Sequence, residues 1–242
     1  MNGQEQPSTV PKVEGHTVRR FDGEMNQIHL KVLEMGGLAL AQLRDALRAL
    51  KYKDAALAQA IAPRENRIDH LEVEADAEVL GLIARRCPMG GDLRMVMAVS
   101  KSVTDLERIG DEAMRIATIA QHIYGKEGAE PNAQLLRDVH LMGDFVVELV
   151  EDALRAFDLL GEDLATEVIA QQDKLEDEFE AGLRRLMTYV MEDARNIGFA
   201  ISVILIIKSL ERIGAHAANL AEYVIFQVRG MDVRHQGAPT AP

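Results

Sequence analysis

Apolar residues recur at alternating steps of three and four positions along most of the chain, which is the period of an amphipathic helix. The first such segment carries them at Phe21, Met25, Ile28, Val32, Met35 and Ala39. Prolines, glycines and polar stretches separate the segments and act as helix-breaking signals. Six long helices are therefore predicted, over 21–50, 54–86, 92 to the YGKEG stretch at 124–128, 132–160, 162–191 and 196–229. Pro63 is expected to kink or restart the second helix, because proline lacks an amide hydrogen and crowds the preceding turn.

The motif LERIG occurs twice, at 106–110 and at 210–214. The twelve residues that begin at each copy, LERIGDEAMRIA and LERIGAHAANLA, are identical at seven positions. A second segment, IAPRENRIDHLE at 61–72, is similar to IAQQDKLEDEFE at 169–180 at nearly the same offset. Similarity in two separate segments at one offset indicates an internal duplication.

The duplication predicts an all-α fold of two tandem, pseudo-symmetric three-helix bundles, one over 19–128 and one over 129–230. The ends of the chain, 1–18 and 231–242, are rich in Pro, Gly and Gln and show no sustained periodicity. They are predicted to be flexible tails.

Both LERIG motifs lie within unbroken apolar stripes. The third helix carries Val96, Val99, Val103, Leu106, Gly110, Ala113, Ala117 and Ala120, and the sixth carries Ala200, Val203, Ile207, Leu210, Gly214, Ala217, Ala221 and Val224. A glycine inside a helix costs about 1 kcal/mol relative to alanine, so it needs a packing reason. Gly110 and Gly214 are therefore expected to lie on buried faces and to let a neighbouring helix come close.

Composition narrows the function classes. The formal net charge is −12, from 39 acidic and 27 basic residues, which argues against nucleic acid as a partner because neutralising phosphates needs a basic surface. The single cysteine, Cys87, excludes an internal disulfide and is expected to pack in a loop. The N-terminus lacks the apolar core of a signal peptide, which favours the cytoplasm. The most apolar run, 199–207, is about half the roughly 20 residues of a membrane span, so a buried helix is expected and no membrane insertion.

Two pairs of carboxylates stand four residues apart: Glu65 and Asp69 on the second helix, and Glu107 and Asp111 on the third. Each pair shares a helix face, and a three-helix bundle would bring the two helices side by side. Such a cluster either raises carboxyl pKa values by repulsion or holds a hard cation. Acidic pairs at this spacing also occur on solvated faces, so spacing leaves both interpretations open. Neither pair is a Glu-x-x-His motif, which disfavours an oxygen-activating di-iron enzyme.

The second half carries a partial copy of these carboxylates. On the fifth helix they are Asp173 and Asp177, although a shift of one residue would substitute Gln172 and Glu176. On the sixth helix Glu211 matches the glutamate of the first LERIG.

One carboxylate is missing from the sixth helix, because Ala215 stands at the position of Asp111. His216 follows it but points about 100° further round the helix, so it cannot replace the lost ligand. Its expected role is to pair or cap locally. Metal binding is therefore expected to be stronger in the first half than in the second.

The motifs of both halves resemble the PhoU family, regulators of phosphate uptake. The resemblance rests on CPMGGDLR at 87–94 with SVTDLERIGDEAMRIA at 102–117, on MEDARNIGFAI at 191–201 with LERIGAHAANLAEYVIF at 210–226, and on HTVRRFDGEMNQIHLKVLEMG at 16–36. It covers roughly residues 16–230. One departure besides Ala215 is Ala194, where the family usually has proline.

The resemblance implies a PhoU-like, often dimeric protein without catalytic activity. It implies a negative regulator of phosphate signalling that couples a Pst-type phosphate transporter, through its ATPase, to a sensor histidine kinase. Members of the family bind metal ions through acidic motifs. For this chain the resemblance implies iron, zinc or magnesium, and only the metal site of the first half is expected to be well occupied. Carried over by position, the implied ligands are Glu65, Asp69, Glu107, Asp111, Asp173, Asp177 and Glu211.

Three alternatives stay open at this point. The protein could be an accessory subunit of a low-affinity phosphate permease, a metal-dependent helical enzyme or metal store, or a purely structural bundle. No nucleophile, base and orienting residue are recognisable together in the sequence, so a non-enzymatic adaptor is the leading hypothesis.

Overall fold

The computed structural model describes residues 19–125, 133–192 and 197–231, and within these ranges its regular structure is helical. The helices are α1 (Arg19–Tyr52), α2 (Ala55–Gln59), α3 (Ala62–Arg86), α4 (Gly91–Tyr124), α5 (Ala133–Leu159), α6 (Glu162–Glu192) and α7 (Ile197–Arg229). The predicted all-α fold with six long helices is confirmed, with one short helix added. The predicted tails lie outside the described residues, apart from Met231, and so does Ala194.

The second predicted helix is divided into α2 and α3, and Pro63 lies in the first turn of α3. Asp54 starts α2, where its side chain accepts a hydrogen bond from the Leu57 amide at 2.9 Å. Proline is tolerated in a first turn, because an amide there has no intrahelical partner. The predicted restart is therefore confirmed, and it places Glu65 in the first turn of α3.

The turn between α3 and α4 contains Cys87, which ends α3 in a left-handed conformation with φ of 47°. The thiol is free and the residue is exposed. The expectation that Cys87 packs in the loop is therefore wrong, because the left-handed C-cap turns its side chain towards solvent.

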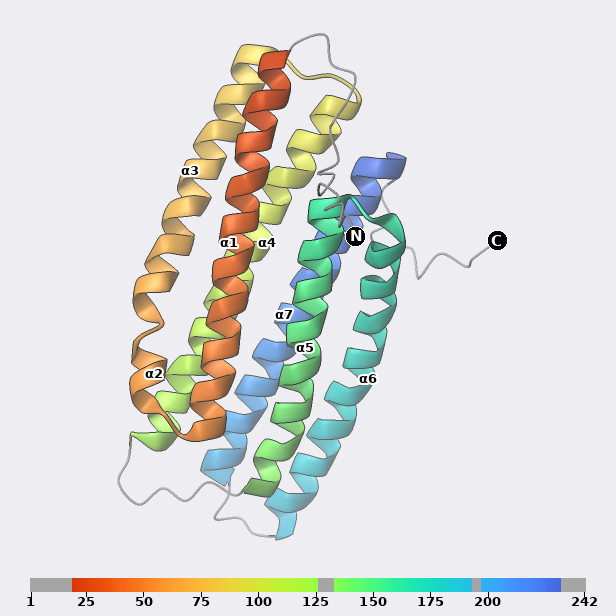
Figure 1. Ribbon diagram of the computed structural model, residues 1–242. Coiled ribbons are helices and arrows are strands. Elements are labelled where there is room, and N and C mark those ends of the chain that lie inside the picture. Colours follow the sequence, from red (N-terminus) through yellow and green to blue (C-terminus); the bar gives the residue numbers. More distant parts are fainter. Residues whose placement is uncertain (1–18, 126–132, 193–196, 232–242) are drawn as a thin grey trace, which may run out of the picture.

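The six long helices form two groups of three, α1 with α3 and α4, and α5 with α6 and α7, and the short α2 packs on α1 and α4. The groups meet through contacts of α1 with α5 and of α4 with α7. Figure 1 shows α3 and α6 at opposite edges of the molecule. Along the α4–α7 contact, Lys101 lies over the Tyr223 ring and Arg212 donates to Glu112. Residue numbers therefore rise along α4 in the direction in which they fall along α7. The two helices are antiparallel, so the two groups run in opposite directions.

Two reciprocal contacts confirm the pseudo-symmetry. Gly36 of α1 faces Leu154 of α5, and Gly143 of α5 faces Leu47 of α1. A Cβ at Gly143 would lie 2.8 Å from Leu47 Cδ2, and one at Gly36 would collide with Leu154. Each half thus contributes one glycine and one leucine to the same kind of contact, as expected of two units related by a pseudo-two-fold axis.

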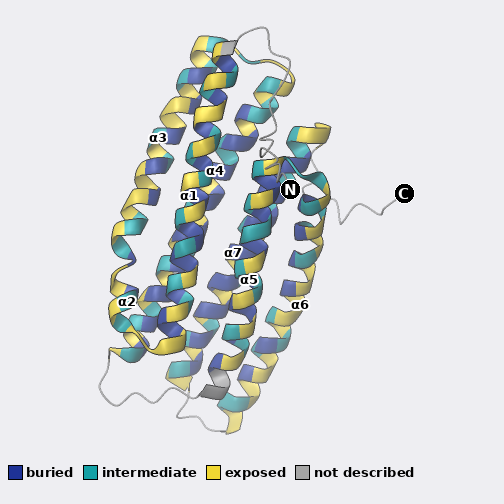
Figure 2. Ribbon diagram, in the orientation of Figure 1, coloured by how far each residue is buried: buried dark blue, intermediate teal, exposed yellow. Residues whose placement is uncertain are grey.

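The buried side chains run as continuous stripes along the inner sides of the helices (Figure 2). The stripes predicted for α1, α4 and α7 are all buried, and both LERIG glycines are among them. The apolar run at 199–207 is only partly covered, since Ile201 is 53% and Leu205 38% exposed. No helix in the described part of the chain is long and apolar enough to cross a membrane.

A buried polar contact joins the two halves. Asp105 on α4 is 6% exposed, and its Oδ1 lies 2.6 Å from His216 Nδ1 on α7. Asn219 Nδ2 donates to the same oxygen at 3.0 Å. His216 does pair, but across the bundle rather than locally as expected, because α4 and α7 approach closely at this level.

Replacing His216 with alanine is expected to lower the free energy of unfolding by about 2–4 kcal/mol, since the buried Asp105 carboxylate would lose its nearest partner. Urea unfolding monitored by circular dichroism would measure this. His70→Ala is the matched control, because His70 is 63% exposed in its pair with Glu74. Its loss should stay below about 0.5 kcal/mol. Similar losses in both variants would contradict the prediction.

Candidate functional site

The carboxylate cluster consists of five side chains where α3 packs beside α4: Glu65, Asp69, Glu72, Glu107 and Asp111. On α3 the buried positions Ile61, Ile68 and Ala75 follow heptad-like spacing. Glu65 and Glu72 occupy the two intervening positions of that stripe and are partly buried. The helix that packs on α4 therefore carries acidic side chains on its inner face.

Glu65 is held from two sides. The buried Gln42 of α1 donates through Nε2 to Glu65 Oε2 and, at 3.0 Å, to the Gly110 carbonyl oxygen. A Cβ at Gly110 would lie 3.2 Å from Glu65 Oε2 and 3.1 Å from Ile68 Cδ1. The glycine of the first LERIG thus leaves room for an apolar side chain and a carboxylate of α3, which confirms its predicted packing role.

Burial raises the pKa of Glu65 to about 7, and the negative charges of Asp111 and Asp69 act in the same direction. The hydrogen bond from Gln42 opposes this rise. Asp69 is itself exposed. Glu65, Asp69 and Asp111 are therefore close enough to influence one another, as the spacing of the acidic pairs predicted.

Glu107 lies on the α4 side of the cluster with 16% of its side chain exposed. Burial raises the pKa of Glu107 to about 7, and the charge of Asp111 adds to the rise. Its Oε2 is buried without a hydrogen bond, although Arg108 Nε lies 3.3 Å away. Arg108 also donates to Asp111 at 3.3 Å, so one guanidinium offsets part of the negative charge.

Sequence reasoning missed Glu72. Burial raises the pKa of its carboxyl, and the charges of Asp76, Asp69 and Asp111 contribute. A signal was present in the sequence, because Glu65 and Glu72 interrupt the apolar stripe of α3 one heptad apart. An acidic side chain at a stripe position is rarer than one on a solvated face and therefore more informative.

As placed, no three His, Cys, Asp or Glu side chains within the described ranges converge as metal ligands. The chemistry of the cluster nevertheless fits a hard cation. Its donors are carboxylate oxygens, three of its carboxyl groups have raised pKa values, and Glu107 Oε2 is a buried oxygen without a hydrogen bond. A bound cation would relieve each of these features.

The second LERIG glycine identifies which residue of α6 corresponds to Glu65. A Cβ at Gly214 would collide with Leu175 and lie 2.7 Å from Gln172 Oε1. Gln172 is buried, as expected for the counterpart of Glu65 beside Gly110. The alternative register is thus supported, and the match of Asp173 to Glu65 is wrong by one residue.

Asp173 and Asp177 are both exposed on α6. The carboxylate one turn after Gln172 is Glu176, which accepts a hydrogen bond from Gln172 Nε2 at 3.5 Å. A neutral amide therefore takes the inner position that a carboxylate holds in the first half.

The remaining partners in the second half also differ. Lys208 Nζ donates to Glu211 Oε2 at 2.5 Å and lies 5.0 Å from the centroid of the Phe179 ring. Phe179 stands one heptad after Gln172, where α3 has its second stripe glutamate. Glu211 thus has a lysine as its counter-ion, and Ala215 supplies no second carboxylate.

The PhoU domain family model matches residues 32–120 and 139–224. This chain belongs to the PhoU family. The two matched ranges lie within α1–α4 and α5–α7, so each three-helix group corresponds to one PhoU domain.

Curated PhoU relatives match almost the whole chain. A phosphate-specific transport system accessory protein PhoU homolog of Pseudomonas putida is 45% identical over 223 residues, covering 92% of this chain and 86% of that protein. The accessory protein PhoU of Escherichia coli is 33% identical over 222 residues, covering 92% and 90%.

Solved PhoU structures have the same fold. PhoU from Pseudomonas aeruginosa superposes with a TM-score of 0.83 at 40% identity, covering 87% of this chain and all of that one. The phosphate transport system regulatory protein PhoU from Streptococcus pneumoniae has a TM-score of 0.78 at 28% identity, covering 88% and 99%.

In metal-free protein, the free energy of unfolding is expected to fall as the pH rises from about 5 to about 8. Glu65 and Glu107 have pKa values of about 7 in the folded chain against an ordinary 4.5. Between these values the folded state binds more protons than the unfolded state, so this stabilisation is complete below about 4.5 and is lost through about 7. The loss should be on the order of 2 kcal/mol after solvent screening.

Urea unfolding in the presence of a chelator, repeated across this pH range, measures the effect. Glu107→Gln keeps the shape of the side chain and removes one titrating carboxyl, so its dependence on pH should be flatter. Equal slopes for the two proteins would contradict the prediction.

Proposed function

We propose that this chain is an accessory protein of a phosphate-specific transport system and a negative regulator of phosphate uptake and of the phosphate-starvation response. The observation that carries the proposal is the match to relatives of this description over 92% of the chain. Both three-helix groups are included in the family match, so the proposal does not rest on one shared domain.

The proposed partners are the ATPase of the transporter and a sensor histidine kinase, with the protein acting in the cytoplasm as a non-catalytic adaptor and homodimer. Helices of up to 34 residues give extended, rigid surfaces on which protein partners could dock. Alternating exposed positions along α3 and α6 leave such surfaces at both edges of the molecule (Figure 2).

The proposal includes a hard metal ion at the carboxylate cluster of the first half. Glu65, Glu107 and Asp111 would hold it, and Asp69 and Glu72 would add negative charge nearby. The metal would supply positive charge that keeps these carboxyl groups ionised. Oxygen-only donors suit magnesium or ferric iron better than zinc, whose usual protein sites include nitrogen or sulfur.

The second half is proposed to need no metal. Lys208 already supplies a positive charge to Glu211, and Gln172 adds no negative charge. The exposed Asp173 and Asp177 stay candidate ligands from the sequence, but they lack the buried setting of Glu65.

Glu107→Gln is expected to weaken metal binding at least about tenfold, because it removes one carboxylate from the proposed ligand set. The matched control is Glu211→Gln at the same position of the second LERIG, and it should leave affinity and stoichiometry unchanged. Calorimetric titration of chelator-treated protein with magnesium or ferric citrate would measure both quantities. Equal losses in the two variants, or loss only with Glu211→Gln, would refute the assignment to the first half.

Deleting the gene is expected to raise expression of phosphate-starvation genes in phosphate-rich medium, and the tagged protein should co-purify with a phosphate-transporter ATPase. Reporter assays and mass spectrometry of the captured proteins would test this. Expressing the Glu107→Gln variant in the deletion strain tests whether the proposed metal site is needed for partner binding and for regulation. An unchanged starvation response together with capture of a low-affinity permease would favour that alternative role.

A further inference from the structure

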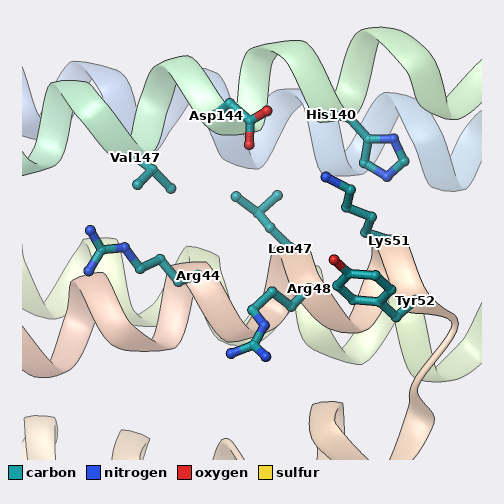
Figure 3. Close-up of a pocket in the computed structure, with 8 residues that line it drawn as sticks. All are labelled: Arg44, Leu47, Arg48, Lys51, Tyr52, His140, Asp144 and Val147. Carbon is teal, nitrogen blue, oxygen red and sulfur yellow. The ribbon is translucent and has the colours of Figure 1, made fainter.

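A pocket of about 330 Å³ lies between α1 and α5, away from the carboxylate cluster on α3 and α4. Its volume is near the lower end of the range for small-molecule sites. Figure 3 shows cationic side chains of α1 and His140 of α5 around it. The polar lining consists of Arg44, Arg48, Lys51, Tyr52, His140 and Asp144. The lining thus has three cationic side chains and one carboxylate, in a chain whose net charge is −12.

Two groups in the pocket lack a partner. His140 Nε2 is buried without a hydrogen bond. Lys51 forms no ion pair with any residue that the structure describes. Burial lowers the pKa of His140, and the charge of Lys51 lowers it further, while Asp144 opposes the shift. Among the described residues, the pocket therefore contains one cation without an ion pair and one imidazole nitrogen without a hydrogen bond.

The two arginines are held in place from outside the pocket. Arg44 donates to Glu151 of α5, and Arg48 Nη1 lies 3.7 Å from Asp45 of α1. These contacts give each arginine a carboxylate partner and leave further N–H groups of its five-donor fork for a ligand. Leu47 and Val147 form an apolar wall between the charged groups (Figure 3).

The matching end of the α1–α5 contact differs in charge. There Arg155 pairs with Asp152, as Arg48 pairs with Asp45, and the two arginines are 66% and 65% exposed. The residue three positions after Arg155 is Asp158, however, and its Oδ1 lies 3.4 Å from His29. Lys51, the lysine that lacks an ion pair within the described ranges, thus belongs to one end and does not follow from the duplication.

We propose that this pocket binds a small phosphorylated anion. Arg44 and Arg48 already have carboxylate partners, so the positive charge available to a ligand comes from the Lys51 ammonium. A phosphate monoester or inorganic phosphate supplies negatively charged oxygens for this ammonium. Its oxygens can accept hydrogen bonds from the Lys51 ammonium and the His140 imidazole, which lie side by side in Figure 3, and Arg48 lines the same pocket. The pocket shares no residue with the carboxylate cluster, so this site would stand even if the proposed metal or transporter role failed.

The test is calorimetric titration of the full chain at physiological ionic strength with inorganic phosphate, with ADP and with succinate. Saturable binding of phosphate or ADP at one site per chain is expected, and the tighter of the two identifies the ligand class. Succinate, a dianion without phosphorus, should bind at least about tenfold more weakly, since it lacks the tetrahedral set of oxygens.

Arg48→Gln and Lys51→Gln should each weaken this binding about tenfold, the usual effect of losing a charged hydrogen bond. Arg155→Gln is the matched control, because it removes the same charge and the same local ion pair outside the pocket. It should leave binding unchanged. Absence of phosphate and ADP binding, succinate binding as tight as theirs, or equal losses in Arg48→Gln and Arg155→Gln would each overturn the proposal.

Discussion

The missing side chain at the LERIG glycine is the constraint on which the rest of the site depends. At Gly110 that space is filled by Ile68 and by the Glu65 carboxylate, which Gln42 anchors from a third helix. One small residue therefore brings three helices together at a single level. Because the Glu65 carboxyl is partly buried in this space, it loses contact with water, and burial raises its pKa to about 7.

The second half keeps this packing and changes its charge. Gly214 accepts Leu175 and Gln172 as Gly110 accepts Ile68 and Glu65, so the backbone arrangement is repeated. An amide replaces the inner carboxylate, and Lys208 neutralises the glutamate of the motif. Packing requires only shape, which both glutamine and glutamate satisfy, whereas a cation site requires charge. Duplicated helices can therefore share one fold although the two copies place different charges beside the glycine.

The contacts between the halves show the same separation of shape and charge. Gly36 with Leu154 and Gly143 with Leu47 repeat a steric contact on both sides of the pseudo-two-fold axis. The polar contacts at the interface of the two halves do not repeat in this way. Asp105 pairs with His216 on one side of the axis. At the two ends of the α1–α5 contact, a cation, Lys51, stands where the other end has a carboxylate, Asp158. The steric contacts between the halves are thus repeated, whereas the surface and interfacial charges differ.

The sequence by itself determined the helices, because their apolar period, the breakers between them and Pro63 act locally. It also determined the duplication and the acidic pairs, since these are properties of residue order. It did not determine the register of α6, where Asp173 was matched to Glu65 and Gln172 was only the alternative. It also did not reveal Glu72, Lys208 or the partner of His216.

Only the tertiary structure decided those points, because each depends on which face of one helix meets another. The side chain opposite Gly214 and the carboxylate opposite His216 are far away in the sequence. The exposed Cys87 depended on the backbone conformation of a turn. The cationic pocket combines residues of α1 and α5. No pattern within one segment of the sequence predicts a pocket that two helices form together. The apolar periodicity is a property of each helix by itself. The burial, the pKa values and the charge balance of side chains depend on how the helices pack against one another.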